Sequence, residues 1–301
     1  KPITTRQQFE RSMNMKMYQF LVVVIAVFVF VSCDKDENNI EEPSAETFIF
    51  EDGFETQNNT IDELFPSNAS RWSTIQQTDP SNATNEMSIS NTEFNEGQNA
   101  LRVRSYQSDS DLSKVDIEKN GLNINLGDKV TIKADFYIVG TESLENLLLI
   151  DLECCSCWDP TVGDNYGSEN QCPGVRLMMS GGNDYLSIER GKISGTTMQQ
   201  TNFAFPRNQW VTVQWEMTLS DNSNGLNRLV IDGREVINEA GMNMPNAQIF
   251  KDVFSEQGID FTLQEPTFYE RVQIGATANP TAGDIELFVD DFSIKVEKKM
   301  P

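Results

Sequence analysis

The clearest pattern along the chain is an alternation of apolar and polar residues in its middle. Every second residue from Val211 to Leu219 is apolar, and the residues between them are polar. This period of two is typical of a strand with one buried face and one face in water. A polar loop over 220–226 follows, and Asp232-Gly233 lies between two further apolar runs, where a hairpin turn needs residues that tolerate a positive φ. The sequence therefore predicts an antiparallel meander.

Similar runs predict further strands on both sides of this segment. Their ranges are Thr47–Glu55, Asn95–Ser105, Lys129–Val139, Leu147–Leu152, Gly174–Ser180, Tyr185–Arg190, Arg271–Thr277 and Asp284–Val296. One short helix is predicted over Asn246–Gln257, and Arg71-Trp72-Ser73 is expected to bring an aromatic ring back against the sandwich edge. Frequent turn signals without strand–helix alternation favour an all-β fold, an antiparallel jelly-roll β-sandwich.

The first part of the chain is expected to be a leader. A weakly basic stretch precedes an apolar run from Phe20 to Val31. A run of about a dozen residues is too short to cross a bilayer of about 30 Å and is typical of a signal peptide, with a membrane-anchor helix as the alternative. We expect a leader over 1–32, an acidic flexible tether over 33–46 and one sandwich domain over 47–301.

The end of the leader resembles a lipoprotein processing site. Phe30-Val-Ser-Cys33 resembles a bacterial lipobox, and the acidic run over 34–39 resembles the export signal of Bacteroidetes-type surface lipoproteins. The resemblance implies diacylation at Cys33 and display at the cell surface, on the outer face of the outer membrane. Several buried acyl chains anchor a protein durably, whereas one chain is marginal.

Composition narrows the choice of partner and of chemistry. The chain has 23 basic and 46 acidic residues, a net charge of −23, and no histidine. Such an acidic surface repels phosphate backbones and argues against nucleic acid, although a solubility adaptation also explains the charge. The lack of histidine excludes Ser–His, Cys–His and histidine-base mechanisms.

Several scattered segments resemble carbohydrate-binding modules with a jelly-roll fold. They are Phe50–Glu55 with the later Trp72, Glu96–Val103 and Leu287–Ile294. The segment from Trp210 to Gly233 is similar to laminin-G-like and concanavalin A-like domains. The resemblance implies a concanavalin A-like jelly roll and favours a glycan partner, although a fold by itself does not fix a function.

A calcium site is expected where the ends of the domain meet. Asp290 falls on the apolar side of the last predicted strand, where a carboxylate is costly unless it is paired or bound to a metal. In the modules that the sequence resembles, a structural Ca²⁺ joins the first and last strands. The matching positions are Glu55 and Asp290, with Asp52 and Asp291 as additions. Alternatively, Asp290 accepts backbone hydrogen bonds and Asp291 is solvated.

The four cysteines of the predicted domain lie close together. They are Cys154, Cys155, Cys157 and Cys172. Outside the cytoplasm such residues are expected to be oxidised, and because neighbouring cysteines pair poorly, Cys172 is predicted to bond one member of the 154–157 cluster. A four-thiolate zinc site is the alternative, although the spacing fits it poorly.

The segment before Cys172 has the residue types of a glycan cleft. Trp158 and Tyr166 could stack on sugar faces, and Asp159 could accept hydrogen bonds from hydroxyl groups. Arg176 and Tyr185 follow on predicted strands and could line the same surface. Alternatively, Trp158 covers the disulfides and Tyr166 only packs the loop.

The sequence favours a cell-surface glycan-binding lipoprotein that captures polysaccharide without catalysis. The alternatives are an adhesion module with a protein partner and a polysaccharide lyase or glycoside hydrolase on the same fold. A lyase would use Tyr185 and Arg176. For a hydrolase, Asp151-Leu-Glu153 is the nearest approach to a sandwich glucanase motif, and it is one carboxylate short.

Overall fold

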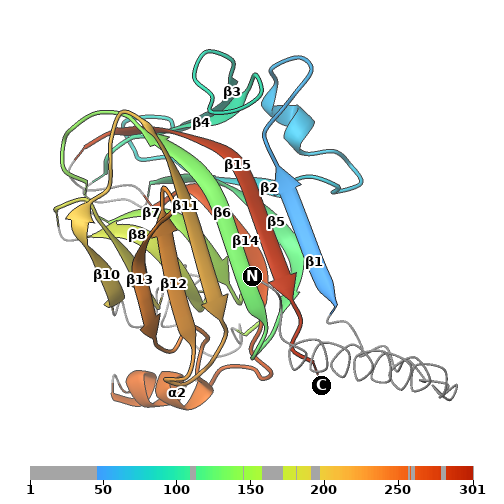
Figure 1. Ribbon diagram of the computed structural model, residues 1–301, viewed down its shortest axis with the longest axis vertical. Coiled ribbons are helices and arrows are strands. Elements are labelled where there is room, and N and C mark those ends of the chain that lie inside the picture. The colour runs from blue at the N-terminus through green and yellow to red at the C-terminus, as the bar shows by residue number, and fades with distance from the viewer. Residues whose placement is uncertain are drawn as a thin grey trace, which may run out of the picture. The chain divides into compact units, whose positions relative to one another are not determined.

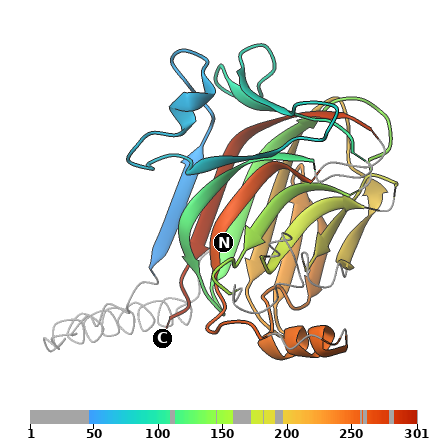
Figure 2. The ribbon, with the colours of Figure 1, turned by 180° about the vertical axis from the view of Figure 1, so that it is seen from behind.

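The described part of the chain is a β-sandwich of two antiparallel sheets (Figures 1 and 2). The computed structural model describes residues 46–108, 113–144, 146–157, 172–180, 182–190, 197–256, 258, 262–278 and 283–300. Residues 45–301 form one compact unit. The predicted all-β jelly-roll class is confirmed. The predicted leader, including Cys33, lies outside the described residues.

Sheet A contains eight strands. In spatial order they are β13 (Arg234–Ala240), β12 (Leu226–Ile231), β11 (Trp210–Thr218), β6 (Lys129–Ile138), β15 (Ile285–Glu297), β4 (Ala100–Ser105) and β3 (Glu86–Ser90), and β1 (Thr47–Asp52) also pairs with β15. The register of β1 and β15 runs from Thr47 opposite Glu297 to Asp52 opposite Phe292. The first and last strands of the domain therefore lie side by side.

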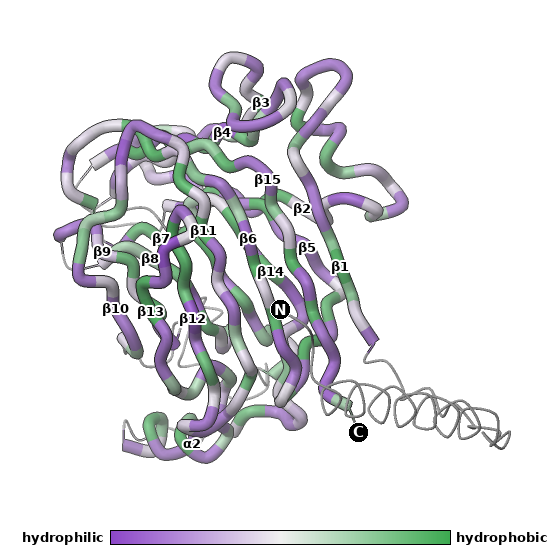
Figure 3. Tube along the Cα trace, viewed as in Figure 1, coloured by the Kyte–Doolittle hydropathy of each residue, from purple (hydrophilic) through white to green (hydrophobic). Residues whose placement is uncertain are grey.

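Sheet B contains seven strands. In spatial order they are β10 (Thr197–Ala204), β9 (Tyr185–Glu189), β8 (Gly174–Ser180), β7 (Leu147–Glu153), β14 (Tyr269–Ala278), β5 (Lys114–Ile124) and β2 (Thr74–Thr78). Every pairing in both sheets is antiparallel. Figure 3 shows hydrophilic and hydrophobic residues alternating along many of these strands, as expected for strands with one face in the core.

The helix and the central hairpin form where the sequence predicts them. The helix α2 (Ala247–Glu256) lies across one end of the sandwich (Figure 1), and the side-chain oxygen of Asn246 accepts a hydrogen bond from the backbone N–H of Ile249 at 3.0 Å, which caps its first turn. Asp232 and Gly233 join β12 to β13 with φ values of 49° and 75°, as a type I′ turn requires. Among the described residues, no helix is both long and apolar enough to cross a membrane.

Four strands and one short helix were not predicted from the sequence: β2, β3, β5, β10 and the 3-10 helix η1 (Ile61–Leu64). In β5, Val115 and Ile117 face the core while Lys114, Asp116 and Glu118, which alternate with them, are charged. Edge strands and strands with charged outer faces have little apolar content, so pairing with their neighbours, rather than local pattern, defines them.

An aromatic cluster joins β1 and β15 to the segment that leads into β2. Trp72 is 1% exposed, and its ring centroid lies 5.2 Å from that of Phe50, 5.9 Å from that of Phe54 and 5.0 Å from that of Phe292. The expected return of an aromatic ring at Trp72 is confirmed, although the ring is fully buried rather than at an edge. Such rings bury large apolar areas, so the cluster stabilises the closure of the domain's ends.

We expect Phe292→Ala to lower the free energy of unfolding by about 3–5 kcal/mol, because it leaves a cavity beside Trp72. Urea titration followed by tryptophan fluorescence measures the change. Phe48→Ala, on β1 at a ring that is 38% exposed, is the matched control and should cost far less. Equal losses in the two variants would contradict this role of the cluster.

Candidate functional site

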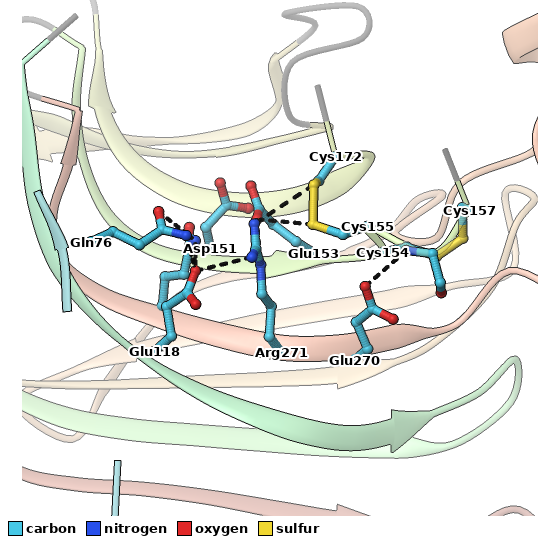
Figure 4. The surroundings of a disulfide bond; sticks show 12 residues. Gln76, Glu118, Asp151, Glu153, Cys154, Cys155, Cys157, Cys172, Glu270 and Arg271 are labelled. Atoms are coloured by element: carbon cyan, nitrogen blue, oxygen red, sulfur yellow. Dashed lines mark hydrogen bonds and ion pairs between the residues drawn. A yellow bond between two sulfur atoms is a disulfide. The ribbon is translucent and has the colours of Figure 1, made fainter. Parts of the chain in front are cut away.

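Charged and amide side chains form a continuous group on the face of sheet B that points away from the core. They alternate with core residues such as Val115 and Ile117 along the strands. The group, called here the charged row, consists of Lys114, Asp116 and Glu118 on β5, Arg271 and Gln273 on β14, Asp151 and Glu153 on β7, Arg176 on β8 and Glu189 on β9. Figure 4 shows part of it on one side of the curved strands.

Strand register aligns these residues across the sheet. Gln273 lies opposite Glu118 on one side and opposite Asp151 on the other. Asp151 lies opposite Arg176, and Arg176 lies opposite Glu189. With neighbouring strands about 4.8 Å apart, the line from β5 to β9 spans roughly 19 Å. That length would accommodate several sugar units rather than one small molecule.

Arg271 is held by glutamates on both neighbouring strands. Its Nη1 lies 3.1 Å from Glu118 Oε1, its Nε donates to Glu153 Oε2 at 2.8 Å, and its Nη2 also binds Glu153. Burial of the guanidinium lowers its pKa, but the charges of Glu153 and Glu118 outweigh this and leave the pKa raised. Arg271 is thus a fixed cation whose donors already serve the protein.

Asp116 is the least satisfied carboxylate of the row. It is 0% exposed, and neither carboxylate oxygen accepts a hydrogen bond, although Lys114 Nζ lies 3.6 Å from Oδ2. Burial raises the pKa of Asp116 to about 7; Lys114 opposes this, and the carboxylates of Glu118, Glu153 and Asp151 add to it. This side chain therefore exchanges a proton near neutral pH.

Arg176 retains hydrogen-bonding capacity on the same face. Its Nη2 lies 3.4 Å from Asp151 Oδ2, yet neither Nε nor Nη2 makes a hydrogen bond of good geometry. The residue is 9% exposed, so these N–H groups are costly to leave unpaired. An oxygen-rich ligand would satisfy them.

Tyr185 lies further along the outer face. It is half-buried at the start of β9, opposite Ser180, and shares its face with Ser187 and Glu189. Ser180 is four residues beyond Arg176 on β8, which is about 13 Å at about 3.3 Å per residue. Of the predicted glycan-binding residues, Arg176 and Tyr185 thus lie on one face of sheet B, whereas Trp158, Asp159 and Tyr166 lie outside the described residues.

Two disulfides lie at the end of β7. Cys155 forms a disulfide with Cys172, which lies just before β8, and Cys154 forms one with Cys157. The sulfur of Cys172 lies 3.6 Å from Arg271 Nη2 (Figure 4). The predicted alternative, a zinc ion held by four thiolates, is not what the structure shows, because all four sulfurs are in disulfides.

The carboxylates expected to bind calcium have protein partners in the structure. Asp52 Oδ2 accepts a hydrogen bond from Arg71 Nε at 2.8 Å, and Glu55 Oε1 accepts one from the backbone N–H of Asn99 at 3.0 Å. Asp291 has a φ of 46° and lies at a register shift in β15. Asp52 and Glu55 would have to exchange or share these partners to bind an ion.

Asp290 accepts backbone hydrogen bonds, which the sequence analysis gave as the alternative to calcium binding. Its Oδ2 accepts from Asn95 at 2.8 Å and from Glu96 at 3.1 Å, and Asp135 lies directly opposite it on β6. Burial raises the pKa of Asp290 to about 6, against the lowering effect of these N–H groups. Calcium binding by Glu55, Asp52, Asp290 and Asp291 stays a prediction.

Most of the charged row was missed by the sequence analysis. Lys114, Asp116 and Glu118 alternate with apolar residues, and so do Arg271 and Gln273. This alternation was the available signal, but it does not say which strands are neighbours. Asp151 and Glu153 were noted only as an incomplete hydrolase motif.

Comparison with known proteins identifies one family and solved structures with a similar fold. A model of the family described as "Polysaccharide lyase" matches residues 66–293. The endo-β-1,4-glucuronan lyase from the fungus Trichoderma reesei superposes with a TM-score of 0.53 at 11% identity, covering 74% of this chain and 90% of that chain. The cellulose induced protein Cip1 gives 0.50 at 12% identity, with 81% and 96% covered. A search among curated proteins found no significant match.

The raised pKa of Asp116 predicts a pH-dependent loss of stability. Because the pKa rises from 3.8 to about 7 on folding, the folded state holds a proton that the unfolded state has released, so this residue's contribution falls as pH rises between these values. Asp116→Asn removes the effect. We expect the free energy of unfolding of Asp116→Asn, relative to that of the parent protein, to increase by up to about 4 kcal/mol from about pH 4 to 7 and then to level off.

Urea unfolding at a series of pH values measures the difference. Asp252→Asn, at an exposed position on α2, is the matched control and should give a difference that changes little with pH. A pH-independent difference for Asp116→Asn would show that this carboxylate titrates normally in the folded protein.

Proposed function

The chain belongs to the polysaccharide lyase family, and we propose from this premise that it cleaves a uronate-containing polysaccharide by β-elimination on the charged row of sheet B. The observation that carries the location is Arg176, a buried guanidinium on the outer face of the sheet whose Nε and Nη2 make no hydrogen bond, although Nη2 lies 3.4 Å from Asp151. Polysaccharide is the substrate class of the family.

Family membership corrects the functional expectation from the sequence. A glycan-binding module that captures polysaccharide without catalysis was expected, and the match over residues 66–293 contradicts this, because a lyase is an enzyme. The alternative of a polysaccharide lyase is the better reading. The resemblance to carbohydrate-binding modules rested on strand patterns, which binding modules and lyases on jelly rolls share.

β-Elimination needs three kinds of group in a site: a base, a cation or hydrogen-bond donors for the carboxylate, and an acid. A base removes the proton at C5, beside the uronate carboxylate; the electron pair forms the C4–C5 double bond; and the bond from C4 to the glycosidic oxygen breaks as that oxygen takes a proton. A cation or hydrogen-bond donors at the carboxylate stabilise the charge that develops, and a positioned acid promotes departure of the oxygen.

Arg176 and Tyr185 have side chains suited to two of these roles, namely binding the carboxylate and protonating the leaving oxygen. The unpaired N–H groups of Arg176 would donate to the uronate carboxylate in a fork geometry. The hydroxyl of Tyr185 would donate the proton to the leaving oxygen. Their separation of about 13 Å along the strands leaves room for one sugar ring between two long side chains.

We expect Tyr185→Phe to lower kcat at least about 100-fold with little change in KM, because it removes only the transferable proton. Arg176→Lys should lower kcat/KM by a similar factor, since the ammonium lacks the planar fork. Ultraviolet absorbance of unsaturated product, measured over a panel of uronate polysaccharides, gives both values.

The matched controls carry the same changes on sheet A. Tyr137→Phe on β6 and Arg104→Lys on β4 should retain activity within about twofold. Full activity in Tyr185→Phe and Arg176→Lys would place the chemistry elsewhere. Failure of the unmodified protein to release unsaturated ends from any polymer would refute the lyase proposal.

We also propose that the protein is a lipoprotein at the cell surface, anchored in the outer membrane through Cys33. The support is the lipobox-like sequence ending at Cys33 and the acidic run after it. In cells fed a labelled fatty acid, the full chain should carry the label and the Cys33→Ser variant should not. Label in both variants, or in neither, would refute lipidation at this residue.

A further inference from the structure

We infer that the charged row selects polysaccharides in which uronates are separated by neutral sugars and discriminates against continuous polyuronates. This inference rests on the proposed function and adds the substrate class. It follows from the sign and the pairing of the charges in the row.

Carboxylates outnumber cations in the charged row. Its acidic members are Asp116, Glu118, Asp151, Glu153 and Glu189, and its basic members are Lys114, Arg176 and Arg271. Protonation of Asp116 near neutral pH still leaves four carboxylates against three cations. The whole chain also has a net negative charge, −23. A polymer with one negative charge on every sugar would therefore approach a surface of its own sign.

Two of the three cations are already engaged by the protein. Arg271 binds Glu118 on one side and Glu153 on the other. Lys114 lies beside Asp116 and donates to the side-chain oxygen of Gln76. A substrate carboxylate could take either cation only by displacing a buried carboxylate or amide, which would then lose its partner at a cost.

Arg176 is ion-paired too, with Asp151 at 3.4 Å, but in the described row it is the one cation with buried nitrogens, Nε and Nη2, that make no hydrogen bond. It is also bracketed by negative charge, because Asp151 lies opposite it on β7 and Glu189 lies opposite it on β9. A uronate bound at Arg176 gains a charge-assisted pair, whereas a second uronate one strand away would meet a carboxylate at about 5 Å. The row thus offers one place for an anion, not a series.

The positions beside Arg176 suit neutral sugars. Carboxylates accept strong hydrogen bonds from hydroxyl groups, which neutral sugars supply in number. Glu189 already accepts one such bond, from the hydroxyl of Thr197 at 2.9 Å. Beyond Asp151 lies the uncharged Gln273, whose side-chain N–H groups donate to Glu118 at 2.6 Å and to Gln76 at 3.2 Å. A uronate flanked by neutral sugars would match this sequence of one cation between hydrogen-bond acceptors.

The test compares polymers that differ in the spacing of their uronates. Alginate and glucuronan carry a uronate on every sugar, whereas gellan and xanthan carry uronates separated by neutral sugars. Binding is measured by gel retardation with each polymer in the gel, and cleavage by ultraviolet absorbance, both at low ionic strength. We expect retardation and cleavage with the spaced polymers and neither with the continuous ones.

A charge-removing variant tests whether the row is responsible. Glu189→Gln keeps the acceptor for Thr197 and removes one charge beside Arg176, so it should raise the affinity for alginate roughly fivefold. Glu239→Gln removes one charge at an exposed position on β13 of the other sheet and should leave that affinity unchanged. Equal gains in the two variants would assign the effect to net charge and overturn the inference.

The remaining outcomes separate this inference from the lyase proposal. Cleavage of alginate or glucuronan by the unmodified protein as fast as that of the spaced polymers, with or without added Ca²⁺, would overturn the inference and support the lyase. Binding of spaced polymers alone, without unsaturated product, would support the inference and overturn the lyase. Neither binding nor cleavage of any polymer would overturn both.

Discussion

The outer face of sheet B depends on how buried charge is compensated. A carboxylate removed from water is costly unless a cation or donors replace the lost hydration. Arg271 compensates two glutamates from two different strands, and the amide of Gln273 donates to Glu118 at 2.6 Å. Asp116 receives no hydrogen bond, and its pKa rises accordingly. Removing Arg271 would take this cation away from Glu118 and Glu153, so the position of each charge depends on the others.

The two-sheet frame holds this compensation in place. Pairing of β1 with β15 and the rings around Trp72 close the domain at its ends. Between Cys155 and Cys172 a disulfide ties the end of β7 to the start of β8, beside Arg271. Side chains built on paired strands and braced by a cross-link are held in fixed positions, which is a condition for oriented catalysis.

The strand patterns that suggested a binding module describe the fold, and binding modules and lyases can share that fold. The strand patterns near Phe50, Trp72 and Leu287 belong to the frame, and many jelly rolls share them. The chemistry that we propose lies on the outer face instead, where Arg176 Nε and Nη2 make no hydrogen bond and Tyr185 is half-buried. An acidic row and a uronate substrate are compatible only if few charges of the polymer meet the row at once, so substrate class and reaction are linked through the same residues.

The sequence by itself determined the all-β class, most strands, the helix capped by Asn246 and the turn at Asp232-Gly233. Each of these depends on a local period or on the φ preferences of a few neighbouring residues. Only the tertiary structure brings the residues of the charged row together. Glu118, Asp151 and Gln273 are far apart in the chain and become neighbours through strand pairing. Because alternation along one strand carries no information about which strand lies beside it, the compensation of charge across the sheet cannot be deduced from the pattern alone.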